Sequence, residues 1–365
     1  MQILFVTRKY PPSIGGMEVY SQELYQALSN KGTDIKLHRP AKPLIGKPSL
    51  LQVLDFSWTT VKAVWRYRRS IDILLLGDVL LTPLSLVVKL FCGSHLKVVA
   101  AAHGNDVYFA QNRSIKGWVY RLGIKSFSRQ VDLLIANSRD TEGAAKKLGF
   151  SLTTRIPLGT TIPDATDPSR ITESAILFAG RLNKCKGLAW FVNEVLPKLA
   201  PDIRLIVAGP KWHDSELDAV LSTHRASYLG AVTRAELDEL RKHVIATVMP
   251  NLPASISGQN EGFGLAALES AAVGIPVVAS RLGGLSEAVV EGITGFLVEP
   301  TNADVFAEKI NEIAKWSPDD RMNFAARATQ EIKQRFTWDR VAQDYLSCFE
   351  KLSTKDNCAS VGGSP

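Results

Sequence analysis

Short apolar runs alternate with longer helix-like stretches along almost the whole chain. The runs are rich in Val, Ile and Leu and are continuous, which is typical of strands buried on both faces of a parallel sheet. Twelve of them, six in each half, are predicted as strands: 2–7, 34–38, 72–76, 96–101, 132–136, 154–156, 175–179, 203–208, 227–229, 244–248, 276–279 and 296–298. Strands of this kind joined by helical crossovers predict an α/β fold made of two doubly wound domains.

Helical periodicity fills the intervals between the predicted strands. It is clearest at 19–30, 188–199, 234–242, 304–315, 320–336 and 339–352. The segment 157–173, rich in Pro, Asp and Thr, separates the two sets of strands and is the best candidate for a linker. We therefore expect domains at 1–165 and 166–338. The tail 353–365 is polar and rich in Gly and Ser, which predicts disorder.

Composition narrows the class of protein. No uncharged apolar run approaches the ~18 residues that a transmembrane helix needs. The start of the chain becomes charged too soon for a signal peptide. The four cysteines are scattered without a C-x-x-C pair, which argues against a disulfide framework or a zinc site and fits a reducing cytoplasm. We therefore expect a cytoplasmic protein.

Two carboxylates eight positions apart, Glu261 and Glu269, enclose the segment Gly262-Phe263-Gly264-Leu265. The glycines precede an apolar helix-forming run, so a ligand can approach the backbone closely, and the helix start offers unpaired N–H groups to an anion. Two acceptors beside such a helix end suit a ligand with hydroxyls and phosphates, such as a nucleotide sugar. Taken alone, the pair also fits a glycosidase with one acid and one nucleophile.

A second candidate is the loop with Arg181 and Lys186, which follows the predicted strand 175–179. In doubly wound sheets, ligands bind beyond the carboxyl ends of the strands, where this loop would lie. Two cations five residues apart and flanked by glycines fit the two phosphates of a diphosphate. An ordinary solvated basic loop is the alternative interpretation.

Three further loops have the same place after a strand and before a helix. The pair Gly15-Gly16 would expose backbone N–H groups or form a plain tight turn, and it is not the G-x-G-x-x-G fingerprint. His103 and Asp106 would aim polar groups into a cleft, unless His103 is a structural histidine. The pair Gly283-Gly284 would present backbone donors or cap the following helix.

Together these motifs resemble those of retaining glycosyltransferases of family four, which have the two-domain fold called GT-B. The resemblance covers almost the whole chain and rests on Gly15-Gly16, His103-Gly104-x-Asp106, Asn137-Ser138, Gly180-Arg181-x4-Lys186-Gly187, Glu261-x7-Glu269, Gly283-Gly284-x2-Glu287, Gly295-Phe296-Leu297-Val298 and Phe336-Thr337-Trp338. It implies two Rossmann-like domains facing a central cleft. The first, completed by helix 339–352, would bind the acceptor, and the second would bind a nucleotide sugar.

The resemblance also implies roles for individual residues. Arg181 and Lys186 would bind the donor diphosphate, while Glu269 would bind the ribose hydroxyls and Glu261 the donor sugar. It assigns catalysis to Glu261, His103, Arg181 and Lys186, and donor binding to Gly15, Gly16, Asp106, Arg181, Lys186, Gly262, Phe263, Gly264, Leu265 and Glu269.

The implied reaction is transfer with retention, by front-face attack while the leaving group is still close. Arg181, Lys186 and helix-end N–H groups would stabilise the departing nucleotide diphosphate. No D-x-D motif is evident, so we expect neither a metal nor another cofactor. The expected donor is a UDP- or GDP-linked hexose. The expected acceptor is a saccharide or lipid-linked molecule of cell-envelope, exopolysaccharide or lipopolysaccharide biosynthesis.

Charge is unevenly distributed along the chain. Residues 1–170 hold 23 Lys and Arg against 12 Asp and Glu, and the remainder holds 20 against 24, so the net charges are +11 and −4. A basic first half suits an anionic partner, either nucleic acid or a phospholipid surface. No nucleic-acid-binding module accompanies the charge, so we do not expect nucleic acid as a partner.

Two segments favour the lipid surface. In 113–129, Arg and Lys alternate with Trp, Ile, Leu and Phe at helical spacing, as in an interfacial helix, and 61–69 is a second basic-aromatic segment. A core-packed helix with a solvated basic face is the alternative. Our hypothesis is that the first domain docks on the inner face of the cell membrane to reach a lipid-linked acceptor.

Three other functions remain compatible with the motifs. A sugar-nucleotide epimerase or a phosphorylase would share the architecture, and a phosphorylase would need a lysine that holds pyridoxal phosphate. An inactive nucleotide-sugar-binding or membrane scaffold would keep the binding residues without turnover.

Overall fold

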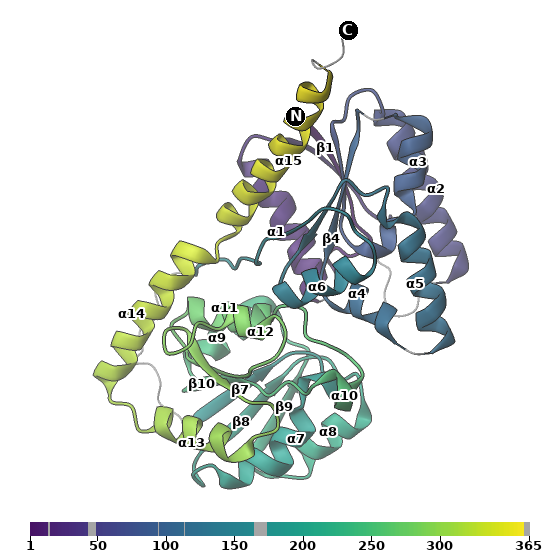
Figure 1. The fold of residues 1–365 in the computed structure, drawn as a ribbon. Coiled ribbons are helices and arrows are strands. Elements are labelled where there is room, and N and C mark those ends of the chain that lie inside the picture. Colours follow the sequence, from purple (N-terminus) through teal and green to yellow (C-terminus); the bar gives the residue numbers. More distant parts are fainter. Residues whose placement is uncertain (14, 43–48, 94, 113, 164–173, 361–365) are drawn as a thin grey trace. The chain divides into compact units, whose positions relative to one another are not determined.

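The computed structural model describes residues 1–13, 15–42, 49–93, 95–112, 114–163 and 174–360. The chain divides into two compact units, which Figure 1 shows in sequence colours. Unit 1 comprises Met1–Leu158 and Trp338–Pro365, and unit 2 comprises Gly159–Thr337. The first boundary lies inside the predicted linker 157–173, of which 164–173 falls outside the described residues, and it precedes the predicted boundary at 165.

The described residues of unit 1 form a six-stranded parallel sheet with the order β2-β1-β3-β4-β5-β6. Its strands are β1 Gln2–Val6, β2 Asp34–His38, β3 Ile73–Leu76, β4 Lys97–Ala102, β5 Leu133–Ala136 and β6 Thr153–Arg155. The direction of chain progression reverses between β1 and β3. In doubly wound sheets such a reversal separates two neighbouring crossovers and opens a crevice at the carboxyl ends of the strands.

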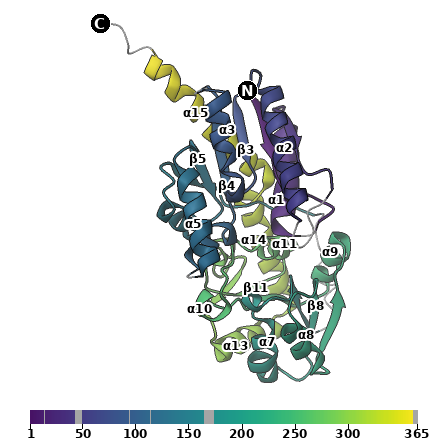
Figure 2. The same ribbon diagram turned by 90° about the vertical axis from the view of Figure 1, so that its right-hand side faces the viewer.

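Helices cover both faces of this sheet. The helices and helical turns of unit 1 are α1 Gly16–Asn30, α2 Leu50–Tyr67, η1 Val79–Leu81, α3 Leu84–Phe91, α4 Asn105–Tyr108, η2 Phe109–Gln111, α5 Ile115–Ser128, α6 Arg139–Lys147 and α15 Trp338–Ser360. On one face α1 packs against α15, where the hydroxyls of Tyr20 and Tyr345 lie 2.8 Å apart. On the other face, α2, α3 and α5 lie side by side (Figures 1 and 2) and contribute Phe56, Val88 and Ile124 to one core.

Unit 2 has a second six-stranded parallel sheet in its described residues, with the order β12-β11-β10-β7-β8-β9. Its strands are β7 Ala175–Ala179, β8 Arg204–Ala208, β9 Ala226–Gly230, β10 Ala246–Met249, β11 Val277–Ser280 and β12 Gly295–Val298. This is the strand order of a Rossmann sheet, and its reversal lies between β7 and β10.

The helical segments of unit 2 connect these strands. They are η4 Lys184–Lys186, α7 Leu188–Trp190, η5 Phe191–Val195, η6 Leu196–Lys198, α8 Asp214–Leu221, α9 Arg234–Lys242, α10 Ala254–Ser257, α11 Leu265–Ala272, α12 Leu285–Ala288, α13 Ala303–Ala314 and α14 Pro318–Arg335. The predicted helix 188–199 is present as α7, a π-helical turn and a 3₁₀ turn. Leu188, Phe191 and Val195 line its buried side.

The predicted α/β class with two parallel doubly wound sheets is confirmed. Each of the twelve predicted strands is present within two residues of its expected bounds in the described part of the chain. The prediction is best founded for the inner strands β3, β5, β10 and β11, which are fully buried, so their apolar runs are uninterrupted. The edge strands β2, β6 and β9 are only partly buried.

The prediction of disorder from Ser353 is wrong for 353–360, because α15 continues to Ser360. The polar side chains there are compatible with a helix: the Ser353 hydroxyl donates to the Phe349 carbonyl at 3.1 Å, and the Thr354 hydroxyl donates to the Glu350 carbonyl at 3.2 Å. Residues 361–365 lie outside the described part. Among the described residues, no helix is long and apolar enough to cross a membrane.

Candidate active site

The loop after β7 and the loop after β10 pack directly against each other at the reversal point of unit 2. Gly187 ends the first loop with φ +68°, and a Cβ there would lie 2.1 Å from the Pro250 carbonyl oxygen. The Leu252 N–H also donates to the Cys185 carbonyl at 2.9 Å. The predicted cation loop is therefore fixed on the neighbouring strand's loop, where a doubly wound sheet binds its ligands.

Where the two loops meet, Lys186, Glu261 and Asn251 form a largely buried polar cluster. The Lys186 ammonium pairs with Glu261 Oε2, and Asn251 Nδ2 donates to the same oxygen at 2.8 Å. The side chains of Lys186 and Glu261 are only 19% and 14% exposed. The Asn183 side chain orients the lysine segment by accepting from the Lys186 N–H at 3.2 Å.

The cluster keeps both charges. Burial opposes ionisation of Glu261, but the Lys186 cation and hydrogen bonds from Lys186, Asn251 and the Gly262 backbone outweigh it and lower the pKa of Glu261. Burial also disfavours the Lys186 cation, but the Glu261 carboxylate outweighs that effect and raises the pKa of Lys186. The Glu261 side chain is therefore a carboxylate that can accept hydrogen bonds, and the Lys186 side chain is a cation.

Asn251 is a site residue that the sequence interpretation missed. Its side chain is buried, and Oδ1 has no hydrogen-bond partner among the described residues. A buried amide oxygen without a donor is costly, so it is a natural acceptor for a ligand hydroxyl. The available signal was its position just after the strand β10, which neighbours β7 at the reversal.

The start of α11 is a candidate anion site next to this cluster. Gly264 precedes the helix at φ +97°, and a Cβ there would lie 2.4 Å from Leu285 Cδ2. Among the described residues, no side chain caps this helix start. The start of α7 differs, because the Glu216 carboxylate accepts from the Ala189 N–H at 2.9 Å. Of these two helix starts, α11 is therefore the one left open to a phosphate.

Glu269 lies one turn into α11 and is held by Arg241 of α9. The Arg241 side chain is 1% exposed; one arm pairs with Glu269 Oε2 and the other with Asp238 at 2.6 Å. The Glu269 side chain remains 18% exposed, so its second oxygen can meet a ligand. Arg241 was also missed, because the sequence shows it only as a basic residue near a helix end.

Several predicted residues support the site through packing. Phe263 is 2% exposed and lies in the core. A Cβ on Gly284 would lie 2.2 Å from the Gly262 carbonyl oxygen, so this glycine lets the loop before α12 rest on the loop before α11. The Arg181 guanidinium lies over the exposed ring of Trp212, 5.3 Å from the ring centroid. The sequence did not indicate Trp212 as a neighbour of Arg181.

Unit 1 holds a separate polar set at the carboxyl ends of its strands. His103 follows β4, and its Nε2 lies 2.8 Å from the Gly77 carbonyl oxygen. Because a carbonyl only accepts, Nε2 carries the proton, which leaves Nδ1 as the acceptor of a neutral ring. The ring also packs edge-on against Tyr20 of α1 at 4.4 Å. Gly15 and Gly16 lie at the start of that helix, which no side chain of the described residues caps.

Asp106 organises the loop that carries His103. Asp106 Oδ1 accepts from the His103 N–H at 2.9 Å, and Oδ2 accepts from the Val79 N–H at 3.5 Å. Burial raises the pKa of Asp106, an effect that His103 and the backbone donors oppose and the nearby Asp78 strengthens. Both oxygens are thus used within unit 1, and direct donor binding by Asp106 stays a prediction.

The predicted residues therefore form two sets. In unit 2, Lys186 and Glu261 are in contact, and Gly262 and Gly264 connect Glu261 to the helix of Leu265 and Glu269. In unit 1, His103 and Asp106 are in contact. Among the described residues, no group of three or more His, Cys, Asp or Glu side chains is placed to hold a metal ion. Independence from a metal stays a prediction.

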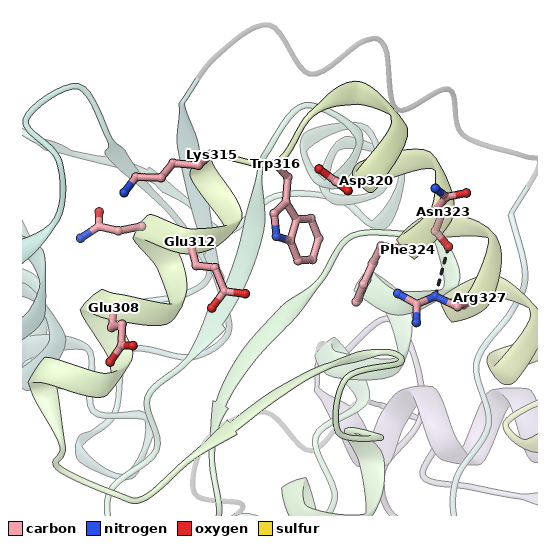
Figure 3. A pocket seen from close by; sticks show the side chains of 9 residues that line it. Glu308, Glu312, Lys315, Trp316, Asp320, Asn323, Phe324 and Arg327 are labelled. Atoms are coloured by element: carbon pink, nitrogen blue, oxygen red, sulfur yellow. Dashed lines mark hydrogen bonds between the residues drawn. The ribbon is translucent and has the colours of Figure 1, made fainter.

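A groove of about 960 Å³ between α13 and α14 (Figure 3) is not part of this site. It lies where α13 ends and α14 begins. Because α13 starts near the carboxyl end of β12 and runs back along the sheet, the groove lies near the amino ends of the strands, away from the candidate site. Its polar groups are satisfied locally: Asp320 accepts from the Ser317 N–H and hydroxyl, and Arg327 Nε donates to the Asn323 carbonyl at 3.4 Å.

Two parallel doubly wound sheets, each with polar residues at the carboxyl ends of its strands, make up the fold of GT-B glycosyltransferases. Sucrose-phosphate synthase of Thermosynechococcus elongatus matches with a TM-score of 0.77 over 97% of this chain and 100% of its own, at 19% identity. Anabaena HepE in complex with UDP and glucose matches with a TM-score of 0.72 over 96% and 99% of the two chains, at 21% identity. At such identities the likeness shows the fold.

Sequence comparison adds a family match for part of the chain. Residues 173–315 match the family described as glycosyl transferases group 1. The D-inositol 3-phosphate glycosyltransferase of Corynebacterium urealyticum is 27% identical over 229 residues, 59% of this chain and 47% of that protein. This chain spans about half the length of the curated relatives it matches. The resemblance is confirmed for the GT-B fold and for residues 173–315 of unit 2, which match the group 1 glycosyltransferase family.

Proposed function

We propose that the protein is a retaining glycosyltransferase that transfers a hexose from a UDP- or GDP-linked donor to a saccharide or lipid-linked acceptor. The observation that carries the proposal is the meeting of a buried cation, a buried carboxylate and an open helix start in one loop cluster of unit 2. A solved structure of the same fold, Anabaena HepE, is in complex with UDP-glucose. The group 1 family match covers the residues of this cluster.

In the proposed complex, the diphosphate binds the first N–H groups of α11 together with Arg181 and Lys186. Glu269, held by Arg241, accepts from the ribose hydroxyls. Glu261 and the free Oδ1 of Asn251 accept from hydroxyls of the hexose. Arg241 and Asn251 thus act as positioning residues for the two carboxylates, and Asn251 also touches the sugar.

The chemistry breaks the bond between the anomeric carbon and the phosphate oxygen. Charge develops on the departing diphosphate, where Lys186, Arg181 and the α11 N–H groups stabilise it. The acceptor hydroxyl attacks from the same face and passes its proton to the departing phosphate oxygen, which retains the anomeric configuration. No step requires a protonated carboxyl from the protein, and we propose that none requires a metal.

The lowered pKa of Glu261 favours transfer over a glycosidase mechanism. A glycosidase needs one carboxylic acid whose pKa is raised, so that it can protonate the leaving group. Glu261 has the opposite shift, and Glu269 is engaged in an ion pair with Arg241. We place the reaction in cell-envelope, exopolysaccharide or lipopolysaccharide biosynthesis, on the cytoplasmic side.

The test is a panel of UDP-, GDP- and ADP-hexoses with thermal shift, donor hydrolysis in the presence of EDTA, and transfer to saccharide acceptors as readouts. One donor class should raise the melting temperature and be turned over. Lys186→Met should lower turnover about 100-fold or more, as expected for one lost transition-state contact. Lys184→Met is the matched control, because Lys184 lies in the same loop but is exposed, and it should retain activity.

Two results would contradict the proposal. If no sugar nucleotide stabilises the protein, the donor site is wrong. If a sugar nucleotide binds but no acceptor or water ever receives the sugar, the protein is a binding scaffold. Equal losses in Lys186→Met and Lys184→Met would argue against the assigned cation.

A further inference from the structure

Three helices on one face of the unit 1 sheet expose an unusually apolar outer surface. We name it the α2–α3–α5 face. Its exposed apolar side chains are Leu51, Val53, Leu54, Trp58, Trp65, Leu86, Leu90, Phe91, Ile115, Trp118, Val119 and Leu122. Ile115 is 82% exposed, Leu51 is 78% and Leu90 is 69%. Isolated apolar side chains are common on surfaces, but a group of this size on one layer marks an interaction site.

In α5 and, apart from Val53, in α2, the exposed apolar side chains lie opposite the buried ones. In α5, Ile115, Trp118, Val119 and Leu122 follow the spacing of one helix face, whereas Ile124 points into the core. In α2, Leu51, Leu54, Trp58 and Trp65 form the outer stripe, whereas Phe56 and Val64 are buried. These helices therefore have two apolar sides, and packing on the sheet accounts for only one of them.

The stripes of α2 and α3 are joined. The rings of Trp65 and Phe91 meet edge to face with centroids 5.5 Å apart. Figure 2 views unit 1 from the side on which α2, α3 and α5 cover the sheet. The three helices thus lie on one face of the unit 1 sheet, and their exposed side chains are those given above.

The charge on this face is mainly positive. Its helices and the residues just after them carry Lys62, Arg66, Arg68, Arg69, Lys89, Lys116, Arg121, Lys125 and Arg129, against the single carboxylate Asp55. Lys89 is paired with Asp132 at 3.3 Å, so the other cations carry the net charge. Two of the cations lie over exposed tryptophans: Lys62 Nζ is 5.0 Å from the Trp58 ring centroid, and the Arg68 guanidinium is 3.9 Å from that of Trp65.

This combination selects the partner. Two copies of the face would bring like charges together, which opposes self-association. An anionic bilayer offers phosphates to the cations and an apolar layer to the tryptophans and leucines, and Trp and Arg are enriched at that depth. We propose that the α2–α3–α5 face docks on the surface of an anionic lipid bilayer. If the protein is the glycosyltransferase proposed above, docking on a bilayer makes a lipid-linked saccharide its acceptor; this choice of acceptor rests on the proposed function.

The experiment is flotation of the full-length protein with vesicles of phosphatidylcholine alone or with phosphatidylglycerol added, at low and high salt. The wild type should bind the anionic vesicles and lose affinity at high salt. Trp58→Glu with Leu90→Glu should lower vesicle binding about tenfold or more, since each places a charge where an apolar side chain meets the interface. The matched control is Leu221→Glu with Met322→Glu, two exposed apolar residues of unit 2.

The outcomes separate this surface from the catalytic proposal. Lost vesicle binding in the test variant, with normal binding in the control and a normal thermal shift by the donor, supports the surface. No binding of the wild type to anionic vesicles overturns it, and so does equal loss in both double variants. A lipid-free dimer that the test variant converts to a monomer would show instead that the face pairs two copies. Turnover of the sugar-nucleotide donor is measured separately for the wild type and both double variants, so a failure of the catalytic proposal can be told from a failure of the surface.

Discussion

At the scale of single residues, the candidate site depends on buried ion pairs whose two members come from different loops or helices. The sequence identified Lys186, Glu261 and Glu269 by spacing and residue type. It did not identify Asn251 or Arg241, since each lies on a separate loop or helix of unit 2 and acts through a contact that only folding creates. Burial makes these pairs strong, because little water competes for the charges.

Glu261→Gln should lower stability in a way that depends on pH. The folded-state pKa of Glu261 is below its ordinary value of 4.5, so its contribution is full above pH 4.5 and disappears as pH falls through the lowered pKa. The pKa of Lys186 is raised above 10.5, so its contribution is full below that pH and is lost as pH rises further. The variant should therefore be less stable by about 3 kcal/mol at pH 7.

Urea unfolding of the wild type and the variant between pH 3 and 9 measures this difference. It should stay constant from about pH 5 to 9 and shrink in acid. Glu308→Gln, at an exposed position on α13, is the control and should change stability little. A difference that grows as pH falls below 4.5 would show that the sign of the Glu261 shift is wrong.

Arg241→Met should weaken donor binding more than it slows the chemical step. It leaves Glu269 without the cation that fixes its carboxylate, so the KM for the donor should rise about tenfold, equivalent to one lost charged hydrogen bond. Arg241→Lys should restore part of the effect if charge, rather than packing alone, is what matters. Lys242→Met, at the neighbouring position paired with Glu239, should leave the KM unchanged. A fall in kcat with a constant KM would exclude a role in ribose binding.

At the scale of elements, the loops after the strands position the site, and glycines let those loops approach one another. The apolar runs predicted every described strand, and the glycine-rich segments lie in loops between strands and helices, as predicted. The sequence left open whether Gly283-Gly284 binds a ligand or serves the fold. The structure shows Gly284 against the Gly262 backbone, a contact between segments twenty-two residues apart that no local pattern encodes.

Gly284→Ala should displace the loop before α11. The new Cβ would meet the Gly262 carbonyl oxygen at 2.2 Å and Phe263 Cα at 2.4 Å, and backbone atoms cannot turn aside as a flexible side chain can. We expect a stability loss of about 1–3 kcal/mol from overpacking and a loss of donor binding. Urea unfolding and thermal shift with the donor measure the two effects.

Gly143→Ala should instead increase the free energy of unfolding. Gly143 lies inside α6, and a Cβ there meets nothing within 4 Å, so the variant should gain about 0.5–1 kcal/mol from helix propensity. Equal effects of the two substitutions would show that the contact at Gly284 does not matter.

At the scale of the whole molecule, the chain builds unit 1, then unit 2, and returns to unit 1 through α15. The C-terminal helix is therefore part of the first unit's core, although the domain of unit 2 precedes it in sequence. Tyr345 and Phe349 are buried on α15, and Tyr20 of α1 meets Tyr345. The amphipathic pattern predicted the helix, and the family resemblance supplied its partner.

Phe349→Ala should destabilise unit 1 and leave unit 2 unchanged. A fully buried phenylalanine contributes about 3–5 kcal/mol relative to alanine, and its core is that of unit 1. Calorimetry should resolve two transitions, of which the one raised by UDP belongs to unit 2, and the variant should lower the other. Lys351→Ala, exposed on the same helix, should lower neither. A variant that lowers the UDP-sensitive transition would contradict this division.

The sequence by itself determined the α/β class, the two sets of six strands, the loops that hold Arg181, Lys186 and Glu261, and the helix that holds Glu269. These follow from periodicity and from residue types at strand ends, which are local properties of the chain. Tertiary structure decided which side chains hold these residues, because Asn251 and Arg241 reach the site from other elements. It also decided which sides of α2 and α5 remain exposed, since an apolar stripe has the same pattern whether it faces a core or a membrane.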